Sequence, residues 1–202
     1  NLFQKPYYLQ HKDLIHLCSF DEITPQESDI ILFSLPSNHK RILAKYFQTK
    51  ISCTQFIHII QNVRHTNIYF DNNYSFRLLA KPLTRICITQ QVYDEILPWV
   101  EDREHLHLIP HGFDFDFFAK EPNPKDQPSI TYNTFKGDFG STVIKKLHSK
   151  NRRIKTQKIE SGISWDDLRS AYQNNPIFLG TPLREEGLYL PSLEAMAAGC
   201  AI

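Results

Sequence analysis

Short apolar runs alternate with helix-like stretches along most of this 202-residue chain, and this alternation limits the possible folds more than any other feature. The strands predicted before residue 120 are 30–33, 55–60, 85–89 and 107–109. The helices predicted between them are 38–50, a short stretch around 76–79 that Pro82 ends, and 91–97. Strands alternating with helices indicate a mostly parallel sheet with helices on both faces.

The alternation pauses at residues 120–129 and then starts again. This segment begins with the letters KEPNPKDQP, and its prolines and mixed charges are typical of a linker. The strands predicted after it are 130–132, 155–159 and 176–179. The helices predicted after it are 140–150, 165–173 with Ser164 as N-cap, and one that starts near Pro191 and ends near Gly199. We therefore predict an α/β domain at 1–119, a linker at 120–129 and a second α/β domain at 130–202.

Charge and hydropathy exclude several classes of protein. The chain has 23 Lys and Arg against 22 Asp and Glu, so we expect no nucleic-acid partner held mainly by its phosphates. No apolar run approaches the roughly 18 residues of a membrane-spanning helix, and no signal peptide is visible. We expect a cytoplasmic protein whose given sequence starts inside a longer reading frame.

Cysteine and histidine spacing gives no sign of a metal site. The four cysteines form no C-x-x-C pair, and we expect buried free thiols in a reducing compartment. The nine histidines show no H-E-x-x-H or similar spacing. Asp114 and Asp116 form a D-x-D pair, but it follows Pro-His-Gly at the end of the first predicted domain, and we do not expect it to bind a metal. We predict no metal ligands.

The segment 186–199, EGLYLPSLEAMAAG, has the strongest chemical signal in the chain. All seven glycines lie between Gly112 and Gly199, which favours the second half as the place where backbone approaches a ligand. A predicted strand leads through a loop into a helix N-terminus, which attracts anions such as phosphate. Glu194, in the first helical turn, has the acceptor oxygens to bind two hydroxyls of a sugar, and Glu186 lies on the preceding loop.

This segment resembles the E-x7-E signature of retaining glycosyltransferases of the GT-B fold, most closely glycosyltransferase family 4. Upstream, residues 107–114, HLIPHGFD, resemble the family's I-P-N-G-V-D stretch. The resemblance covers about residues 30–202. It implies two Rossmann-like parallel-sheet domains, of which the C-terminal one is incomplete in this chain.

The resemblance also implies an activity. It implies transfer of a hexose, with retention, from a nucleotide-diphosphate sugar to a hydroxyl of a glycan, a lipid or a small molecule, as in polysaccharide biosynthesis. The N-terminal half would hold the acceptor, and the donor would lie in the cleft between the halves. Family members usually need no metal, and we expect no cofactor apart from the donor sugar.

Particular residues match the family's functional positions. The resemblance implies that Glu194 binds the ribose, that Glu186 contacts the hexose, and that Lys136 neutralises the diphosphate as it leaves. The backbone N–H groups that would position the sugar and phosphates belong to Gly187, Leu188 and Tyr189, and the turn that would pack on the base is Gly162–Ile163.

The acceptor side is less defined by sequence. Asn62, Arg64 and His65 follow a predicted strand, where ligand-contacting loops lie in α/β proteins, and they are candidates for acceptor contact or for a solvated loop. Near Lys155, the run Arg152-Arg153-Lys155-Lys158 is either a solvated basic face or a peripheral membrane contact.

Departures from the family pattern leave alternatives open. Thr131 occupies the place of an Arg that commonly precedes the loop lysine, and no catalytic His can be assigned after the strand at 55–60. One alternative is a non-catalytic sugar-nucleotide-binding or partner subunit with the same fold. Another is a different GT-B enzyme, such as a sugar-nucleotide epimerase or a phosphorylase.

Overall fold

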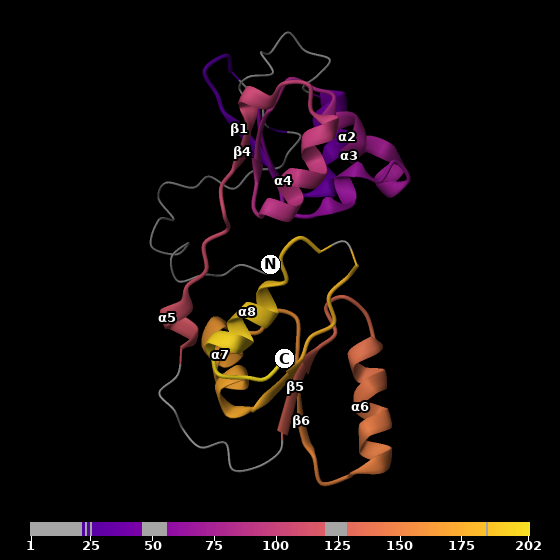
Figure 1. Cartoon of the computed structure of the whole chain (residues 1–202), viewed down its shortest axis with the longest axis vertical. Coiled ribbons are helices and arrows are strands. Elements are labelled where there is room, and N and C mark those ends of the chain that lie inside the picture. The colour runs from indigo at the N-terminus through magenta and orange to yellow at the C-terminus, as the bar shows by residue number, and fades with distance from the viewer. Residues whose placement is uncertain (1–21, 23, 25, 46–55, 120–128, 185) are drawn as a thin grey trace. The chain divides into compact units, whose positions relative to one another are not determined.

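The computed structural model describes residues 22–202 except for 23, 25, 46–55, 120–128 and 185 (Figure 1). Its backbone forms two compact units. The N-terminal unit comprises the described residues up to Gly112 together with Arg184–Leu188, and the C-terminal unit comprises Phe113–Leu183 and Tyr189–Ile202. The predicted linker up to residue 128, Cys18, Cys53 and the end of the helix predicted at 38–50 lie outside the described residues.

The N-terminal unit contains a four-stranded parallel sheet in the order β1-β2-β3-β4. Its strands are β1 (Ile31–Phe33), β2 (Phe56–Ile60), β3 (Thr84–Cys87) and β4 (Leu106–Leu108). Its α-helices are α2 (Pro36–Lys45), α3 (Tyr74–Leu79) and α4 (Gln90–Ile96). Short 3₁₀ segments lie between these elements: η4 (Val63–Thr66) and η5 (Phe70–Asn73) between β2 and α3, and η6 (Leu97–Trp99) and η7 (Arg103–His105) between α4 and β4. Each predicted strand and helix of this region is therefore present.

The described helices of this unit pack on one face of the sheet. Phe33 and Phe56 on the strands join Ile42 on α2 in one buried cluster. Ile60 and Val92 belong to a second cluster that joins β2 to α4. On the opposite face, Leu32 and its register partner Ile57 are exposed and half-buried, respectively. The prediction of helices on both faces is therefore not met by the described helices of this unit.

A buried arginine joins α3 to β3. Arg85 on β3 is fully buried. Its guanidinium donates hydrogen bonds to the backbone carbonyls that end α3 and the turn after it, those of Leu78, Leu79, Lys81 and Leu83. The last carbonyls of a helix have no partner within the helix, and a basic side chain can satisfy them. Arg85 therefore replaces the missing helical hydrogen bonds.

The C-terminal unit contains a second parallel sheet, in the order β6-β5-β7 (Figure 1). Its strands are β5 (Ser129–Asn133), β6 (Lys155–Ile159) and β7 (Ile177–Leu179). Its helices are α5 (Phe115–Phe118), α6 (Phe139–Lys150), α7 (Trp165–Asn174) and α8 (Leu190–Ala197). Ala201, after α8, forms a parallel bridge with Ile177. The prediction of two Rossmann-like parallel α/β units is confirmed.

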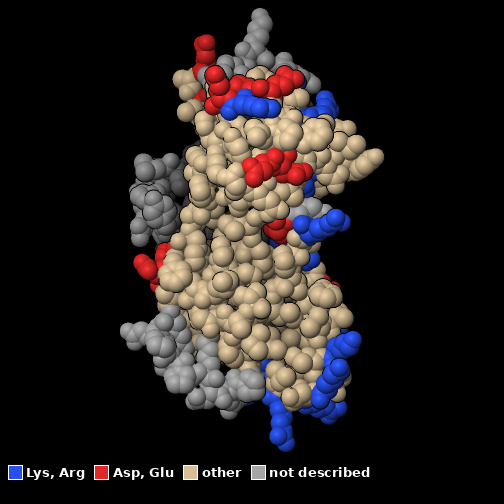
Figure 2. All heavy atoms as spheres, viewed as in Figure 1, with Lys and Arg blue, Asp and Glu red and all other residues tan. Residues whose placement is uncertain are grey.

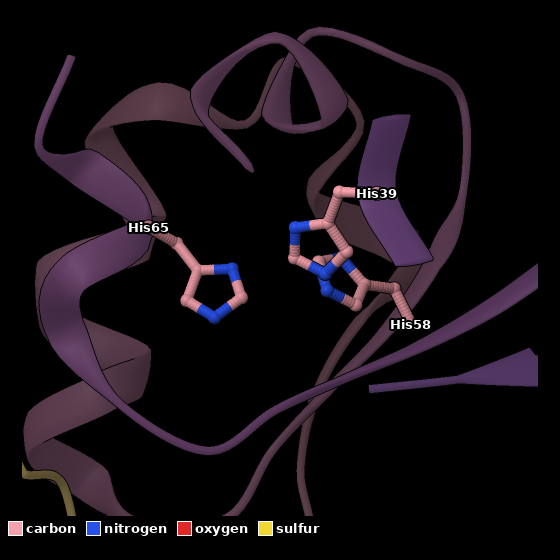
Figure 3. A group of neighbouring side chains, drawn as sticks. All are labelled: His39, His58 and His65. Atoms are coloured by element: carbon pink, nitrogen blue, oxygen red, sulfur yellow. The ribbon is translucent and has the colours of Figure 1, made fainter. Parts of the chain in front are cut away.

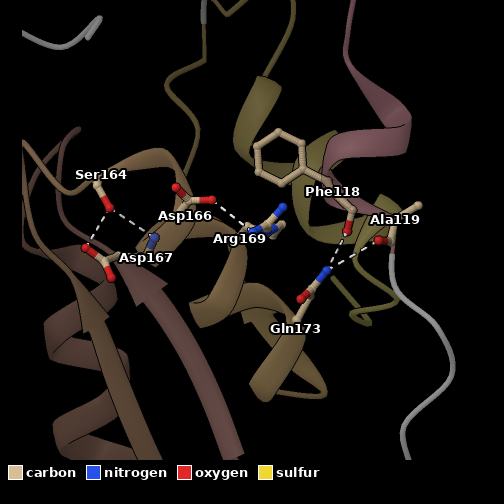
Figure 4. A network of polar contacts seen from close by, with 7 residues as sticks. All are labelled: Phe118, Ala119, Ser164, Asp166, Asp167, Arg169 and Gln173. Atoms are coloured by element: carbon tan, nitrogen blue, oxygen red, sulfur yellow. Dashed lines mark hydrogen bonds and ion pairs between the residues drawn. The ribbon is translucent and has the colours of Figure 1, made fainter. Parts of the chain in front are cut away.

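The first helix of this unit, α5, packs against α7 (Figure 4). Phe118 lies in the core with Tyr172 and Ala195. The side-chain amide of Gln173 donates to the carbonyls of Phe118 and Ala119, both at 3.3 Å. The structure therefore divides the chain after Gly112, whereas the sequence suggests a first domain that ends at residue 119.

The predicted cap of α7 is present in the same view (Figure 4). The Ser164 hydroxyl accepts a hydrogen bond from the backbone N–H of Asp167 at 3.1 Å and donates to the carboxylate of Asp167 at 2.6 Å. Asp166 and Asp167 both lie in the first turn, where negative charge stabilises a helix. Local sequence alone is thus enough to start this helix at the predicted residue.

Basic side chains gather at the turn between α6 and β6. Arg152, Arg153 and Lys155 are exposed there, and Figure 2 shows blue atoms at the bottom of the view, where Figure 1 draws this turn. Lys158 on the same strand forms an ion pair with Glu160 at 3.1 Å. Among the described residues, no helix has the length and apolar character needed to cross a membrane.

Candidate functional site

The carboxyl end of the C-terminal sheet has the geometry at which open α/β sheets bind ligands. The chain leaves the central strand β5 toward β6 on one side and later enters β7 on the other side. The connections after β5 and β7 therefore run in opposite directions at this edge. Ligands of such sheets bind at this topological switch point.

Tyr189 joins the ends of these two strands. Its hydroxyl lies 3.1 Å from the donor nitrogen and 3.2 Å from the oxygen of the Asn133 amide at the end of β5. It also accepts a hydrogen bond from the backbone N–H of Thr181, after β7, at 3.4 Å. The backbone role that the resemblance implies for Tyr189 stays a prediction, and the structure shows in addition that its side chain links the two strand ends. Asn133 is the residue directly after a predicted strand, and this position was the one signal that could have identified it.

Two glycines let helices approach these strand ends closely. A Cβ on Gly140, in the first turn of α6, would lie 3.0 Å from the carbonyl oxygen of Asn133. A Cβ on Gly180 would lie 3.0 Å from the ring of Tyr189 and 3.2 Å from the Ser192 hydroxyl of α8. A larger residue at either position would push the helix away from the edge of the sheet.

Lys136 lies on the loop from β5 to α6, and its side chain is exposed. The next residue, Gly137, has a φ of 123° in the left-handed region, which favours glycine. A loop of this kind, from a parallel strand through a glycine to a helix N-terminus, is typical of phosphate sites. Lys136 therefore follows the same carboxyl end of β5 as Asn133 does. The diphosphate role that the resemblance implies for Lys136 stays a prediction.

Helix α8 begins at Leu190 with Pro191 in its first turn, as the sequence predicts, but Glu194 lies beyond that turn and not within it. Pro191 has no N–H, and the N–H of Ser192 donates to the carbonyl of Tyr189 at 3.1 Å. This helix end therefore presents fewer N–H groups to an anion than a typical first turn does.

Glu194 of α8 is almost buried, with 6% of its surface exposed. Its carboxylate takes part in a hydrogen bond with the side chain of Tyr172 on α7. Burial, and next the negative charge of Glu194, raise the pKa of the Tyr172 hydroxyl, which therefore stays protonated and donates. The sequence identifies Glu194 as a candidate but gives no sign of Tyr172, because the two residues meet only when α7 packs on α8.

Gly162 and Ile163 form the turn between β6 and α7. Gly162 has a φ of 83°, so glycine is favoured there. The two residues line an open hollow of about 550 Å³ over β6 and α7, together with Gln157, Glu160 and Asn174. Ile163 also packs against the core of the unit. The predicted contact with a nucleobase stays a prediction.

Glu186, Gly187 and Leu188 belong to the N-terminal unit, unlike Tyr189 and Glu194. Glu186 forms an antiparallel β-bridge with Asn62, just beyond the end of β2. A Cβ on Gly187 would lie 2.5 Å from the carbonyl oxygen of Gln61 and 2.7 Å from Val92 of α4. Gly187 therefore has a packing reason to be glycine, in addition to the ligand role that the resemblance implies.

The acceptor candidates divide between two environments. The side chain of Arg64 donates from Nε to the Asn62 amide oxygen at 2.7 Å and lies over the Phe70 ring, with its guanidinium carbon 5.2 Å from the ring centroid. His65, by contrast, is 1% exposed and points into the interior of the unit. The structure thus brings Asn62 and Arg64 together with Glu186, and it separates His65 from them.

Comparisons with known proteins extend this description. No protein-family model matches this chain, and no curated protein matches it. Among solved structures, the crystal structure of Anabaena Alr3699/HepE in complex with UDP is similar to it, with a TM-score of 0.57 and 13% identity. The match covers 84% of this chain and 58% of that chain, so this chain spans little more than half the length of its structural neighbour. At this identity the likeness shows the fold alone.

Proposed function

We propose that this chain is part of a retaining glycosyltransferase that uses a nucleotide-diphosphate sugar. One observation supports this most directly: the segment with the E-x7-E pattern connects β7 to α8 at the carboxyl edge of a parallel sheet. A protein with the same fold was crystallised with UDP, a nucleoside diphosphate of the kind that such a donor releases.

The proposed donor contacts follow the chemistry of the residues. Glu194 accepts hydrogen bonds from the ribose hydroxyls, and Gly162–Ile163 packs on the base. The Lys136 ammonium stabilises the negative charge that grows on the diphosphate as the bond to the sugar breaks. Glu186 contacts the hexose, and the acceptor is a hydroxyl of a glycan, a lipid or a small molecule. Such a site stabilises charge separation and requires no covalent enzyme nucleophile.

Calorimetric binding of a panel of nucleoside diphosphates tests the donor site. We expect one base type to bind, with at least about tenfold weaker affinity in Glu194→Gln and in Lys136→Ala, since each removes a charge-assisted contact. Lys146→Ala is the matched control, because Lys146 is exposed on α6 away from the loop, and its affinity should equal that of the parent. If none of the nucleoside diphosphates binds, the donor assignment is wrong.

A non-catalytic sugar-nucleotide-binding subunit is the second candidate. Thr131, at the position of the family's arginine, is buried within β5 and its hydroxyl donates to the Gln157 carbonyl at 3.2 Å. The charge that would assist departure of the diphosphate is therefore missing from this strand. Release of nucleoside diphosphate from the donor sugar separates the candidates: binding without release favours the subunit. Release that depends on an acceptor favours the transferase over an epimerase or a phosphorylase.

A further inference from the structure

Three histidines meet in the interior of the N-terminal unit, on segments that are separate in the sequence (Figure 3). His39 lies on α2, His58 on β2 and His65 on η4. One ring nitrogen from each lies within 4.8 Å of the corresponding nitrogens of the other two. All three residues are at most 1% exposed. Figure 3 shows His65 on one side of a common space, with His39 and His58 on the other.

Most of the ring nitrogens lack a hydrogen-bond partner among the described residues. This holds for both nitrogens of His58, both nitrogens of His65 and Nε2 of His39. Leaving a buried polar group without a partner costs free energy, and such groups are rare in folded proteins. A ligand that accepts the lone pair of each ring would remove part of this cost.

A polar relay orients the ring of His39. The carboxylate of Asp71 accepts hydrogen bonds from the Ser75 hydroxyl at 2.8 Å and from the Ser75 backbone N–H at 3.0 Å. Because the Ser75 hydroxyl donates to Asp71, it must accept from Nδ1 of His39, which lies 2.7 Å away. The lone pair of His39 is therefore on Nε2. Metal-ligating histidines typically have an outer partner of this kind on the ring nitrogen that does not bind the metal.

The backbone that presents Asp71 is strained. Asp71, Asn72 and Asn73 have φ values of 44°, 55° and 63°, three consecutive non-glycine residues in the left-handed region. Such conformations cost energy and persist where the surrounding structure requires them. Here the strained turn places a carboxylate directly behind the Ser75–His39 pair.

Burial disfavours the charged form of all three rings. Burial lowers the pKa of His39 to about 4, although Asp71 and the backbone of Ser34 raise it in part. Burial, with the charges of His39 and Arg64, lowers the pKa of His65 to about 3. Burial also holds the pKa of His58 well below its usual value.

Aromatic packing explains the contacts on the faces of the rings, but it does not explain why nitrogen atoms lie at their edges. His58 stacks on Phe33 with centroids 4.6 Å apart and an interplanar angle of 11°. That contact covers a face of the imidazole and leaves the nitrogens at its edge without partners. An aromatic cluster in the core would not need three rings with nitrogens at these positions.

We propose that His39, His58 and His65 bind one divalent transition-metal ion, most favourably Zn²⁺. Imidazole ligands suit zinc and its neighbours, whereas Mg²⁺ and Ca²⁺ require oxygen ligands. Tetrahedral Zn²⁺ binds imidazole nitrogens at about 2.0–2.1 Å, so the ligand nitrogens would have to move closer together than in this structure. The ion would join α2, β2 and η4, and the three imidazoles leave the fourth tetrahedral position to a water molecule or another small ligand.

Cobalt and zinc binding to the complete 202-residue chain, without an affinity tag and stripped of metal, tests the proposal. We expect about one Co²⁺ per chain, with the visible absorption of a tetrahedral site, and displacement of that band by Zn²⁺. We also expect Zn²⁺ to raise the unfolding temperature, because it binds the folded state. A parent chain that binds neither ion overturns the proposal, whatever any variant does.

Variants locate the ion. His58→Gln and His65→Gln should abolish the cobalt band, and Ser75→Ala should weaken binding about 10–100-fold by removing the outer partner of His39. His107→Gln is the matched control, since His107 is exposed on β4, and it should bind as the parent does. If the cobalt band survives in folded His58→Gln and His65→Gln, the ion binds elsewhere and the proposal is wrong.

Discussion

Asn62 and Glu186 pair through their backbones as an antiparallel β-bridge at the end of β2. The sequence identifies one as an acceptor-side candidate and the other as a donor-side candidate. The segment that carries Glu186 packs with the N-terminal unit, while Glu194 of the same motif lies in the C-terminal unit. The E-x7-E segment is therefore divided between the two units, with Glu186 in the N-terminal unit and Glu194 in the C-terminal unit.

Close packing at Gly187 predicts that Gly187→Ala destabilises the N-terminal unit. The new methyl group would lie 2.5 Å from the Gln61 carbonyl oxygen, which is backbone and cannot rotate away. We expect a loss of about 1–3 kcal/mol in the free energy of unfolding, measured by urea denaturation. Gly112→Ala is the control, because nothing lies within 4 Å of its added Cβ. Equal stability of the two variants would show that the contact with Gln61 is not tight.

The role of Arg85 predicts a large effect of its removal. Arg85→Met would remove the guanidinium donor from the carbonyls of Leu78, Leu79 and Leu83, and we expect a loss of about 3 kcal/mol or more in the free energy of unfolding. Arg85→Lys should lose less, since an ammonium keeps the charge but lacks the planar fork that reaches several carbonyls. Thermal unfolding measures both variants. Arg103→Met, at an exposed position, should be nearly neutral, and a similar loss there would contradict this interpretation.

The contact between Tyr172 and Glu194 predicts a combined effect on stability and binding. Tyr172→Phe removes the hydroxyl and leaves the nearly buried carboxylate without that donor, at a cost of about 1–3 kcal/mol. Under the proposed function, nucleotide affinity falls as well, because the carboxylate loses its fixed orientation. Unfolding and calorimetry measure the two effects. Tyr69→Phe, at a residue that is 87% exposed, should change neither, and parent-like behaviour of Tyr172→Phe would disprove the coupling.

Thiol chemistry gives a further prediction. Burial raises the pKa of the Cys87 thiol to about 12, although the charge of Arg85 lowers it in part. The reactive thiolate is therefore scarce at pH 8.5, and iodoacetamide should modify Cys87 far more slowly in the folded chain than in urea. Cys200 is also buried and should behave alike. Peptide mass spectrometry distinguishes the two sites, and rapid labelling of either in the folded chain would contradict the prediction.

These two thiols agree with the sequence prediction of buried free cysteines, and several other predictions share the same local origin. Strand and helix positions follow from apolar periodicity, and the start of α7 at Ser164 follows from a cap that a few adjacent residues define. The parallel order of the strands follows from their alternation with helices. Such features depend on neighbours along the chain, so the sequence shows them directly.

Contacts between distant segments are different. No spacing in the sequence indicates that His39, His58 and His65 meet, that Arg85 reaches the end of α3, or that Tyr172 touches Glu194. Gly187 is a candidate ligand-loop glycine in the sequence, and only the structure shows that it also packs closely against Gln61 and Val92. The sequence by itself determined the elements, the fold class and the candidate segment at 186–199. Only the tertiary structure decided which side chains share a site, because that depends on how helices pack on a sheet and not on distance along the chain.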